Sequence, residues 1–223
     1  MECFEGTVSR SKSYLHVIAA LYDRQQATKL CRQLLERITN AQNREYLLNM
    51  RTVDEFDIRG RKVDARVAAI HIAAYNGNSG VVRLLCQEYG VDANCSTSET
   101  IEEEPRKGMT ALEWAARKGH IEVVKALLEN KADVNKSGQY GITLLHVAAA
   151  GLLITEVVTV LFDNKADVNA GLHTDGATPL HVACQVGHIE IVKLMLENKS
   201  EVNASRHTIN QSIHPSINRL IDD

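Results

Sequence analysis

Aromatic side chains are scarce in this sequence, at 4% of its 223 residues, and there are only three prolines and one tryptophan. Hydrophobic residues nevertheless form 44% of the chain. Any core must therefore be built mainly from aliphatic and small side chains. A chain of this length is large enough for one domain with a substantial core.

Long hydrophobic runs are also missing. No apolar stretch approaches the roughly 18 residues that span a bilayer, and the first five residues have neither the basic head nor the apolar core of a signal peptide. The five cysteines are odd in number, scattered, and contain no Cys-X-X-Cys pair, which is typical of a reducing compartment. We therefore expect a cytoplasmic or nuclear protein without direct membrane insertion.

Strong charge of one sign and the common catalytic motifs are absent too. The formal net charge is −3, which gives no general attraction to phosphate backbones, so nucleic acid is not an expected partner. The sequence contains no Gly-X-X-X-X-Gly-Lys-Ser/Thr phosphate loop, no Gly-X-Ser-X-Gly elbow and no His-Glu-X-X-His zinc pair. We expect neither enzyme activity nor a cofactor.

What the sequence does contain is a pattern that occurs four times. In its last copy, residues 176–203, Thr178 is a good helix N-cap because its hydroxyl can accept a free amide hydrogen. Pro179 follows at the first helical position, where its missing N–H costs nothing. Gly187 permits a sharp reversal, and apolar residues recur at helical spacing after it. The stretch predicts a pair of short antiparallel helices.

Each copy ends in a triplet of an acidic residue, any residue and asparagine. The asparagines of these triplets, Asn94, Asn135, Asn169 and Asn203, follow one another after 41, 34 and 34 residues. The apolar positions of the second helix line up in all four copies. A self-similar period of this size is typical of a solenoid, in which each unit buries its apolar face against its neighbours.

Several motifs resemble the ankyrin repeat, whose period is about 33 residues: Thr178-Pro179-Leu180-His181-Val182-Ala183, Gly187-His188, Gly119-His120 and Ala132-Asp133-Val134-Asn135. The resemblance implies an all-α ankyrin-repeat solenoid of stacked antiparallel helix pairs joined by β-hairpin-like loops. The expected division is an N-terminal helical region over 1–63 (a degenerate capping repeat and an irregular segment), repeats over 64–94, 108–135, 136–169 and 170–203, an acidic loop insertion over 95–107, and a partial repeat or C-terminal cap over 204–223.

Within residues 1–63 the apolar spacing predicts two helices, from Ser13 to about Ile38, then a short helix over 43–50 and an extended segment over 53–58. In the next repeat, one extra residue near Tyr89 and Gly90 should lengthen the tail of the second helix. The repeat over 136–169 carries one extra residue around 151–153, which predicts a longer hinge.

Two positions of the repeat over 108–135 depart from the pattern. Glu113 stands where the other units have histidine, and in this fold that histidine generally bonds backbone groups of the neighbouring turn. The resemblance therefore implies a different polar network at Glu113. Trp114 matches Ile72, Val147 and Val182 of the other units, and we expect it in the core.

Nine histidines and five cysteines could suggest a metal. His71, His146 and His181 are explained by the repeat register, however, as are His120 and His188 after their glycines. Because these residue types recur once per repeat and do not cluster, we expect no metal site.

The resemblance places partner binding on a concave surface made by the inner helices and the loop tips. The positions of this surface that vary between units are Tyr75, Asn76, Arg106, Lys107, Arg117, Lys118, Gln139, Tyr140, His173, Thr174, Asp175 and Gln185. Tyrosine and arginine are common anchors in protein interfaces. We expect a monomeric, non-catalytic scaffold or adaptor that binds a protein partner there; an ordinary solvated face is the alternative for any one of these residues.

Three alternatives stay open. The chain could be the targeting domain of a larger multidomain protein, or an inhibitor that occludes a partner enzyme. The acidic loop is either a tolerated surface loop or a contact for a basic partner. Finally, Asn135 and Asn169 each close a Leu, five residues, Asp-Val-Asn pattern that resembles the substrate of intracellular asparaginyl hydroxylases, although a structural role in the turn accounts for the same residues.

Overall fold

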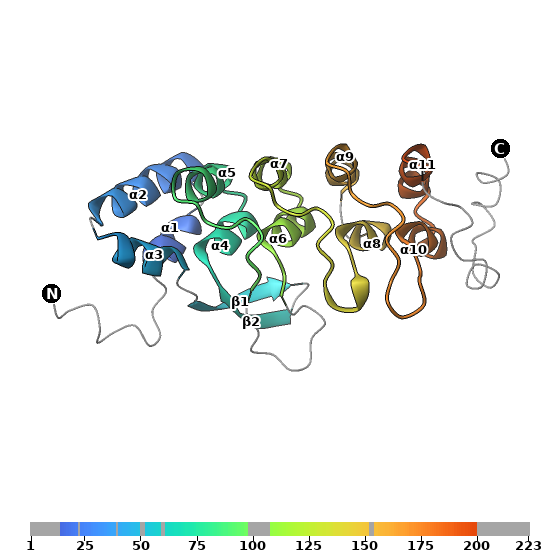
Figure 1. The fold of residues 1–223 in the computed structure, drawn as a ribbon, viewed down its shortest axis with the longest axis horizontal. Coiled ribbons are helices and arrows are strands. Elements are labelled where there is room, and N and C mark those ends of the chain that lie inside the picture. Colours follow the sequence, from blue (N-terminus) through green and yellow to red (C-terminus); the bar gives the residue numbers. More distant parts are fainter. Residues whose placement is uncertain are drawn as a thin grey trace.

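The computed structural model describes residues 14–21, 23–38, 40–49, 52–58, 61–97, 108–151 and 154–199. Pairs of short helices stand side by side in a row and give an elongated molecule (Figure 1). The helices are α1 (Tyr14–Ala19), α2 (Arg24–Arg37), α3 (Ala41–Asn49), α4 (Ala69–Tyr75), α5 (Ser79–Arg83), α6 (Ala111–Lys118), α7 (Ile121–Glu129), α8 (Leu144–Ala149), α9 (Thr155–Asp163), α10 (Pro179–Val186) and α11 (Ile189–Glu197).

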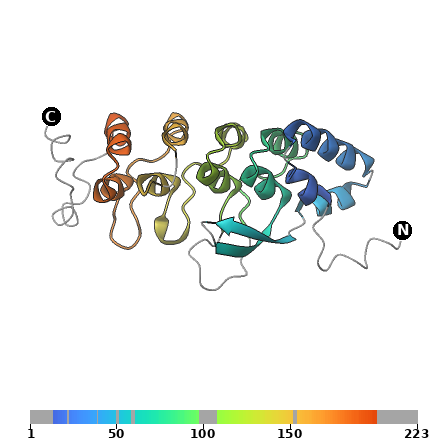
Figure 2. The ribbon, with the colours of Figure 1, turned by 180° about the vertical axis from the view of Figure 1, so that it is seen from behind.

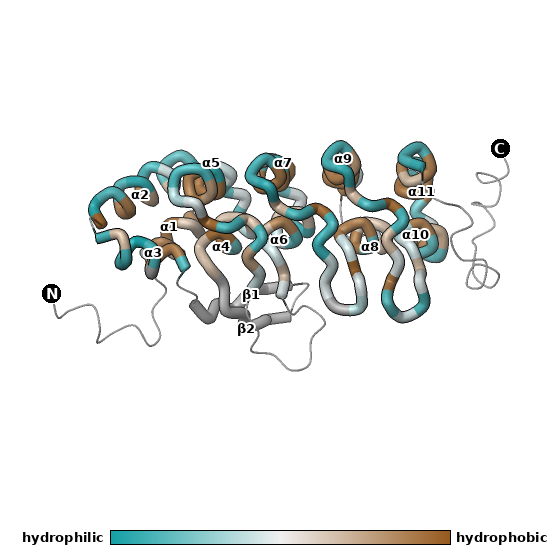
Figure 3. The backbone as a smooth tube through the Cα atoms, in the orientation of Figure 1, coloured by the Kyte–Doolittle hydropathy of each residue, from teal (hydrophilic) through white to brown (hydrophobic). Residues whose placement is uncertain are grey.

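Three layers run along the row. The outer layer contains α2, α5, α7, α9 and α11, the inner layer contains α1, α4, α6, α8 and α10, and the loops between units project below the inner layer (Figures 1 and 2). The outer helices turn their apolar sides toward the inner layer and their polar sides away from it (Figure 3). The expected stack of antiparallel helix pairs is confirmed.

The core lies between the two helical layers and continues from one unit to the next. Each unit contributes large side chains that are less than 2% exposed, namely Leu15, Leu35, Ile70, Leu85, Leu112, Leu127, Leu145, Leu161 and Met195. Trp114 is 3% exposed, as expected for a core position. Alanines such as Ala73, Ala115 and Ala148 are fully buried and allow the inner helices to approach one another closely.

The contacts between neighbouring units are not uniform. Inner helix α1 packs on α4, α4 on α6, and α8 on α10, whereas α6 and α8 make fewer contacts with one another. At that junction the outer helices α7 and α9 pack together. We call the boundary between α6 and α8 the seam.

The N-terminal helices α1 and α2 pack on each other and on α4 and α5, so they form a first helix pair of the row. After α3, two antiparallel strands follow, β1 (Thr52–Ile58) and β2 (Arg61–Val67), with Thr52 opposite Val67 and Ile58 opposite Arg61. The expected extended segment over 53–58 is thus β1. The expected repeat boundary at residue 64 falls inside β2, because the partner strand that defines β2 lies outside the repeat pattern.

Helix α10 begins and ends where its sequence predicts. Pro179 is its first residue and Gly187, with φ of 85°, ends it in the left-handed conformation. Thr178 is the N-cap residue and forms a capping box with His181. The Thr178 hydroxyl lies 2.7 Å from Nδ1 of His181, which also accepts the Thr178 backbone N–H at 3.1 Å.

The extra residue expected near Tyr89 and Gly90 is absorbed within the outer helix. Helix α5 continues directly as a π-helix over Leu84–Glu88, whose wider turn accommodates one additional residue. The chain then closes with a hydrogen bond from Val91 N to Leu85 O at 3.0 Å. The extra residue of the repeat over 136–169 was expected around 151–153. Residues 152 and 153 of this segment lie outside the described residues.

Candidate functional site

Histidines at the start of inner helices α4 and α8 link their units to the next. In His71 and His146, Nδ1 accepts the backbone N–H of residues 68 and 143, both at 3.2 Å. This fixes the proton on Nε2, which donates to the carbonyl of Cys95 and of Ala177 in the following units, both at 3.0 Å. The loops that carry these carbonyls are therefore held against the inner layer by buried side chains.

Glu113 breaks this series, as its sequence predicts. Its carboxylate accepts the backbone N–H of Thr110 at 2.7 Å, and its own N–H donates to the Thr110 hydroxyl at 3.2 Å. The carboxyl group is thus used within its own unit. Burial raises its pKa above the ordinary value, although the bonds from Thr110 and the nearby Arg117 act in the opposite direction. The junction that lacks the histidine is the seam.

Asparagines of the repeated triplets form a second link between units. The side chain of Asn135 donates to Lys165 O at 3.2 Å and accepts from Asp167 N at 2.7 Å. Asn94 bonds Lys131 O and Asp133 N in the same way, at 3.0 and 2.7 Å. The expected side-chain to backbone bonds at these turns are confirmed, and they also join neighbouring units.

Aromatic and basic side chains gather on the surface of α4 and α6. The Tyr75 and Trp114 rings meet edge to face with centroids 5.5 Å apart. The Lys118 ammonium lies 4.1 Å from the centre of the Tyr75 ring, a cation–π contact. The sequence predicted Trp114 in the core but did not show that it supports Tyr75, because Tyr75 ends α4 whereas Trp114 lies in the middle of α6.

The loop that precedes α8 and the loop that precedes α10 contact each other. Tyr140 is 52% exposed and has a φ of 62°, a conformation that is costly for a residue other than glycine. Its carbonyl accepts the backbone N–H of His173 at 2.9 Å. A large aromatic side chain is thus displayed to solvent on a loop that is tied to its neighbour.

The remaining expected binding residues differ in what the structure shows. Asn76 donates its amide to Ile72 O at 2.9 Å, and Asp175 accepts from Ala177 N at 3.0 Å, so both side chains stabilise local structure. Thr174 and Gln185 are exposed. Arg117 is half-buried. Arg106, Lys107 and the side chain of Gln139 lie outside the described residues, as does most of the acidic loop over 95–107.

The residues considered for metal and redox chemistry do not assemble. Among the described residues, no group of three His, Cys, Asp or Glu side chains is placed to hold a metal ion. Burial raises the pKa of the Cys31 and Cys86 thiols to about 12, which keeps both protonated. In the part of the chain that the structure describes, no helix has the length and apolar character of a membrane span.

This arrangement of stacked helix pairs, with bonds from one unit to the loop of the next, defines a helical repeat solenoid. The ankyrin repeat family matches residues 7–138 and 135–206. The chain therefore belongs to the ankyrin repeat family. The match begins well before residue 64, so the helices near the N-terminus that sequence reasoning treated as degenerate are included in it.

Three similar proteins match only part of this chain. Over 83 residues the chain is 36% identical to a palmitoyltransferase AKR1 of Lachancea kluyveri, which covers 37% of this chain and 10% of that protein. Over 56 residues it is 46% identical to Inversin-B of Xenopus laevis, covering 24% and 6%. Over 81 residues it is 32% identical to a putative ankyrin repeat protein, FPV244, of Fowlpox virus, covering 36% and 11%. The chain thus matches about a tenth or less of the length of these relatives.

Proposed function

We propose that this protein is a non-catalytic scaffold or adaptor that binds a protein partner through the inner helices and loop tips. Ankyrin repeats are generally protein-interaction modules and typically non-catalytic. The observation that carries the proposal is Tyr140, a large exposed side chain held at the tip of a loop in a conformation that costs free energy. Such a cost persists where the surroundings enforce it, and binding residues are often placed this way.

We call the proposed binding surface the palm. Its members are Tyr75, Asn76, Arg117, Lys118, Tyr140, His173, Thr174, Asp175 and Gln185, together with Arg106, Lys107 and Gln139. Tyr75 with Lys118 lies on the inner helices, and Tyr140 with His173 lies on the loops that project below them (Figure 1). A partner that contacts both groups would bury an aromatic anchor at each and a positive charge beside one of them.

Changing Tyr140 to glycine should weaken capture of the partner at least about tenfold. Glycine removes the side chain and adopts positive φ freely, so the folded protein should be as stable as the wild type or more stable. Affinity capture with quantitative mass spectrometry, followed by titration of the recovered partner against both proteins, measures the loss. Unfolding in urea, followed by circular dichroism, verifies that the fold is retained.

Lys165→Gly is the matched control for Tyr140→Gly. Lys165 also has a positive φ, of 63°, but it lies after outer helix α9, away from the palm. The Lys165→Gly variant should be as stable as the wild type or more stable, and it should capture the partner as the wild type does. Equal partner recovery with wild type and Tyr140→Gly would reject the palm as the binding surface.

We propose two alternative roles for the same surface. The chain matches only a small fraction of the length of each relative, which supports a targeting role within a larger multidomain protein. An inhibitor that covers an enzyme cleft is the other, and it predicts that an enzyme is recovered in the capture experiment and loses activity on titration. For either role we propose a monomer in the cytoplasm or nucleus.

Hydroxylation of Asn135 and Asn169 stays a prediction. Asn135 is exposed, and its amide makes the two bonds between units. A hydroxylase would therefore have to open this junction before it reached the side chain. Mass spectrometry of the protein from cells should find one added oxygen on peptides that contain these residues, and consistently unmodified peptides would reject the hypothesis.

A further inference from the structure

A basic hollow lies on the outer layer, on the side of the molecule away from the loop tips. It has a volume of about 520 Å³ and lies between α2 and α5, lined by Arg24, Gln25, Thr28, Lys29, Arg32, Ser79 and Gly80. Three of these side chains carry positive charge and none carries negative charge. Two lining residues have hydroxyl groups. The hollow therefore combines the donor types that bind oxyanions.

The hollow exists because one unit departs from the pattern of the others. The first two residues of the outer helices are Ile121-Glu122 in α7, Thr155-Glu156 in α9 and Ile189-Glu190 in α11, but Ser79-Gly80 in α5. An acidic side chain is therefore missing at position 80, which faces Thr28 of α2.

Glycine at position 80 is also required by space. A Cβ atom there would lie 2.4 Å from the Thr28 hydroxyl oxygen, which is too close for any contact without a shift of Thr28. The close approach of α2 and α5 thus excludes the glutamate that the other units carry at this position.

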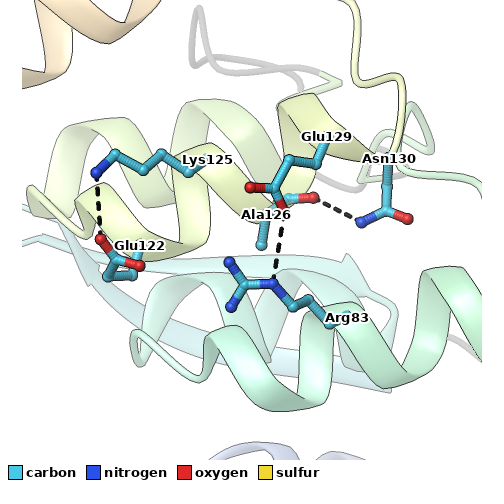
Figure 4. Close-up of polar contacts among 6 residues, drawn as sticks. All are labelled: Arg83, Glu122, Lys125, Ala126, Glu129 and Asn130. Carbon is cyan, nitrogen blue, oxygen red and sulfur yellow. Dashed lines mark hydrogen bonds and ion pairs between the residues drawn. The ribbon is translucent and has the colours of Figure 1, made fainter.

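The cations of the hollow have few acidic partners. Arg32 pairs with Glu88. Among the described residues, neither Arg24 nor Lys29 makes an ion pair. Two basic side chains elsewhere on the outer layer have acidic partners: Lys125 pairs with Glu122 at 3.3 Å and Arg83 with Glu129 at 3.5 Å (Figure 4). The glutamate that pairs with Lys125 is the residue that Gly80 replaces.

We propose that this hollow binds a phosphorylated serine or threonine side chain of a partner protein. A phosphoryl group has close to two negative charges and three acceptor oxygens. They match the Arg24 and Lys29 cations, which make no ion pair among the described residues, and the Ser79 hydroxyl, whereas the Thr28 hydroxyl already donates to Arg24 O at 2.8 Å. A carboxylate would use fewer of these donors. The formal net charge of the chain is −3, which disfavours the broad anionic surfaces of membranes and nucleic acids.

The site is separate from the palm and does not depend on it. Its residues come from the outer helices, whereas those of the palm come from inner helices and loops (Figures 1 and 2). Loss of binding at one site is therefore distinguishable from loss at the other, because Tyr140→Gly should leave phosphopeptide binding unchanged.

The test uses the full chain and a peptide library in which each peptide has a central phosphoserine or phosphothreonine, with the unphosphorylated and glutamate-substituted libraries beside it. The phosphorylated series should be retained and the other two should not. For the tightest peptide, the dissociation constant should rise at least about tenfold in the double variant Arg24→Gln with Lys29→Gln. Amide NMR signals of Thr28, Ser79 and Gly80 should shift on titration with this peptide.

The double variant Lys125→Gln with Lys193→Gln is the matched control, since it removes the same charge from exposed positions of α7 and α11. Its affinity should stay within about twofold of wild type. Equal weakening of both double variants would overturn the proposal in favour of general charge attraction. So would equal binding of glutamate peptides, or binding to vesicles that contain phosphoinositides without binding to any phosphopeptide. Circular dichroism of both variants verifies that α2 is retained.

Discussion

Replacing His146 with leucine should lower the free energy of unfolding by about 2–4 kcal/mol. Leucine preserves the burial of the side chain, which is 4% exposed, but removes its polar contacts. The Thr143 N–H and hydroxyl lose their acceptor Nδ1 and Ala177 O loses the donor Nε2. The buried N–H without a partner is the largest cost. Equilibrium unfolding in urea measures the change.

His181→Leu separates the two roles of this histidine. His181 caps its own helix through Nδ1 as His146 does, but within the described part of the chain its buried Nε2 has no hydrogen-bond partner. His181→Leu should therefore cost less, by roughly the value of one hydrogen bond, about 1 kcal/mol. Equal losses in the two variants would show that the bond between units contributes nothing measurable.

The second large effect is a loss of stability as the pH falls. Burial lowers the pKa of both His120 and His146 below the ordinary 6.5, and for His120 the charges of Arg24 and Lys118 add to this. Their carbonyl partners, Tyr75 O and Ala177 O, act in the opposite direction without cancelling it. The unfolded chain thus takes up protons before the folded one. The contribution of these histidines to the free energy of unfolding should be fully present above about pH 6.5. Below that pH it should decrease, by up to about 1.4 kcal/mol per pH unit for each histidine.

Glu113 changes the free energy of unfolding with pH in the opposite direction. Its folded pKa is raised above 4.5, so the folded protein gains a proton first, and its contribution to stability increases as the pH drops through the folded value. It therefore offsets part of the histidine effect at the acid end. Urea unfolding at a series of pH values from about 7.5 to 5 measures the sum.

His120→Asn is the control for the pH profile. Asn78 stands at the equivalent position of the preceding unit and donates to Ala19 O at 2.7 Å, much as His120 contacts Tyr75 O at 3.0 Å. Asparagine should keep the bond and remove one titrating group, so roughly half of the loss between pH 7.5 and 5.5 should disappear. A profile that is unchanged by this substitution would contradict the assignment.

Sequence reasoning succeeded where the determinants are local. Pro179 and Gly187 set the ends of α10 through their own backbone preferences. The extra residue near Gly90 was visible as a break in the period, and its accommodation in the same helix was predicted, though the π-helical form was not. Glu113 was predicted to change the polar network, because the residue type alone removes the donor that bonds the next unit.

The features that the sequence did not show concern partners that are distant in the chain. Strand β2 was assigned to the following repeat because its pairing with β1 leaves no periodic signal. The cations of α2 and the facing residue Gly80 lie more than forty positions apart in the chain, so no local sequence pattern relates them. Only the fold brings the two together, and only a comparison of Gly80 with the glutamates of later units shows what is missing.

The seam has a mechanical consequence. Glu113 does not reach across to the next unit, and α6 and α8 are less tightly packed than the other inner pairs, so bending and twisting of the row should concentrate there. Lys118 lies on one side of this flexible joint and Tyr140 on the other. A ligand bound to both residues would restrict this bending. Its affinity would therefore be lowered by the conformational entropy that the protein loses when the two halves stop moving relative to each other.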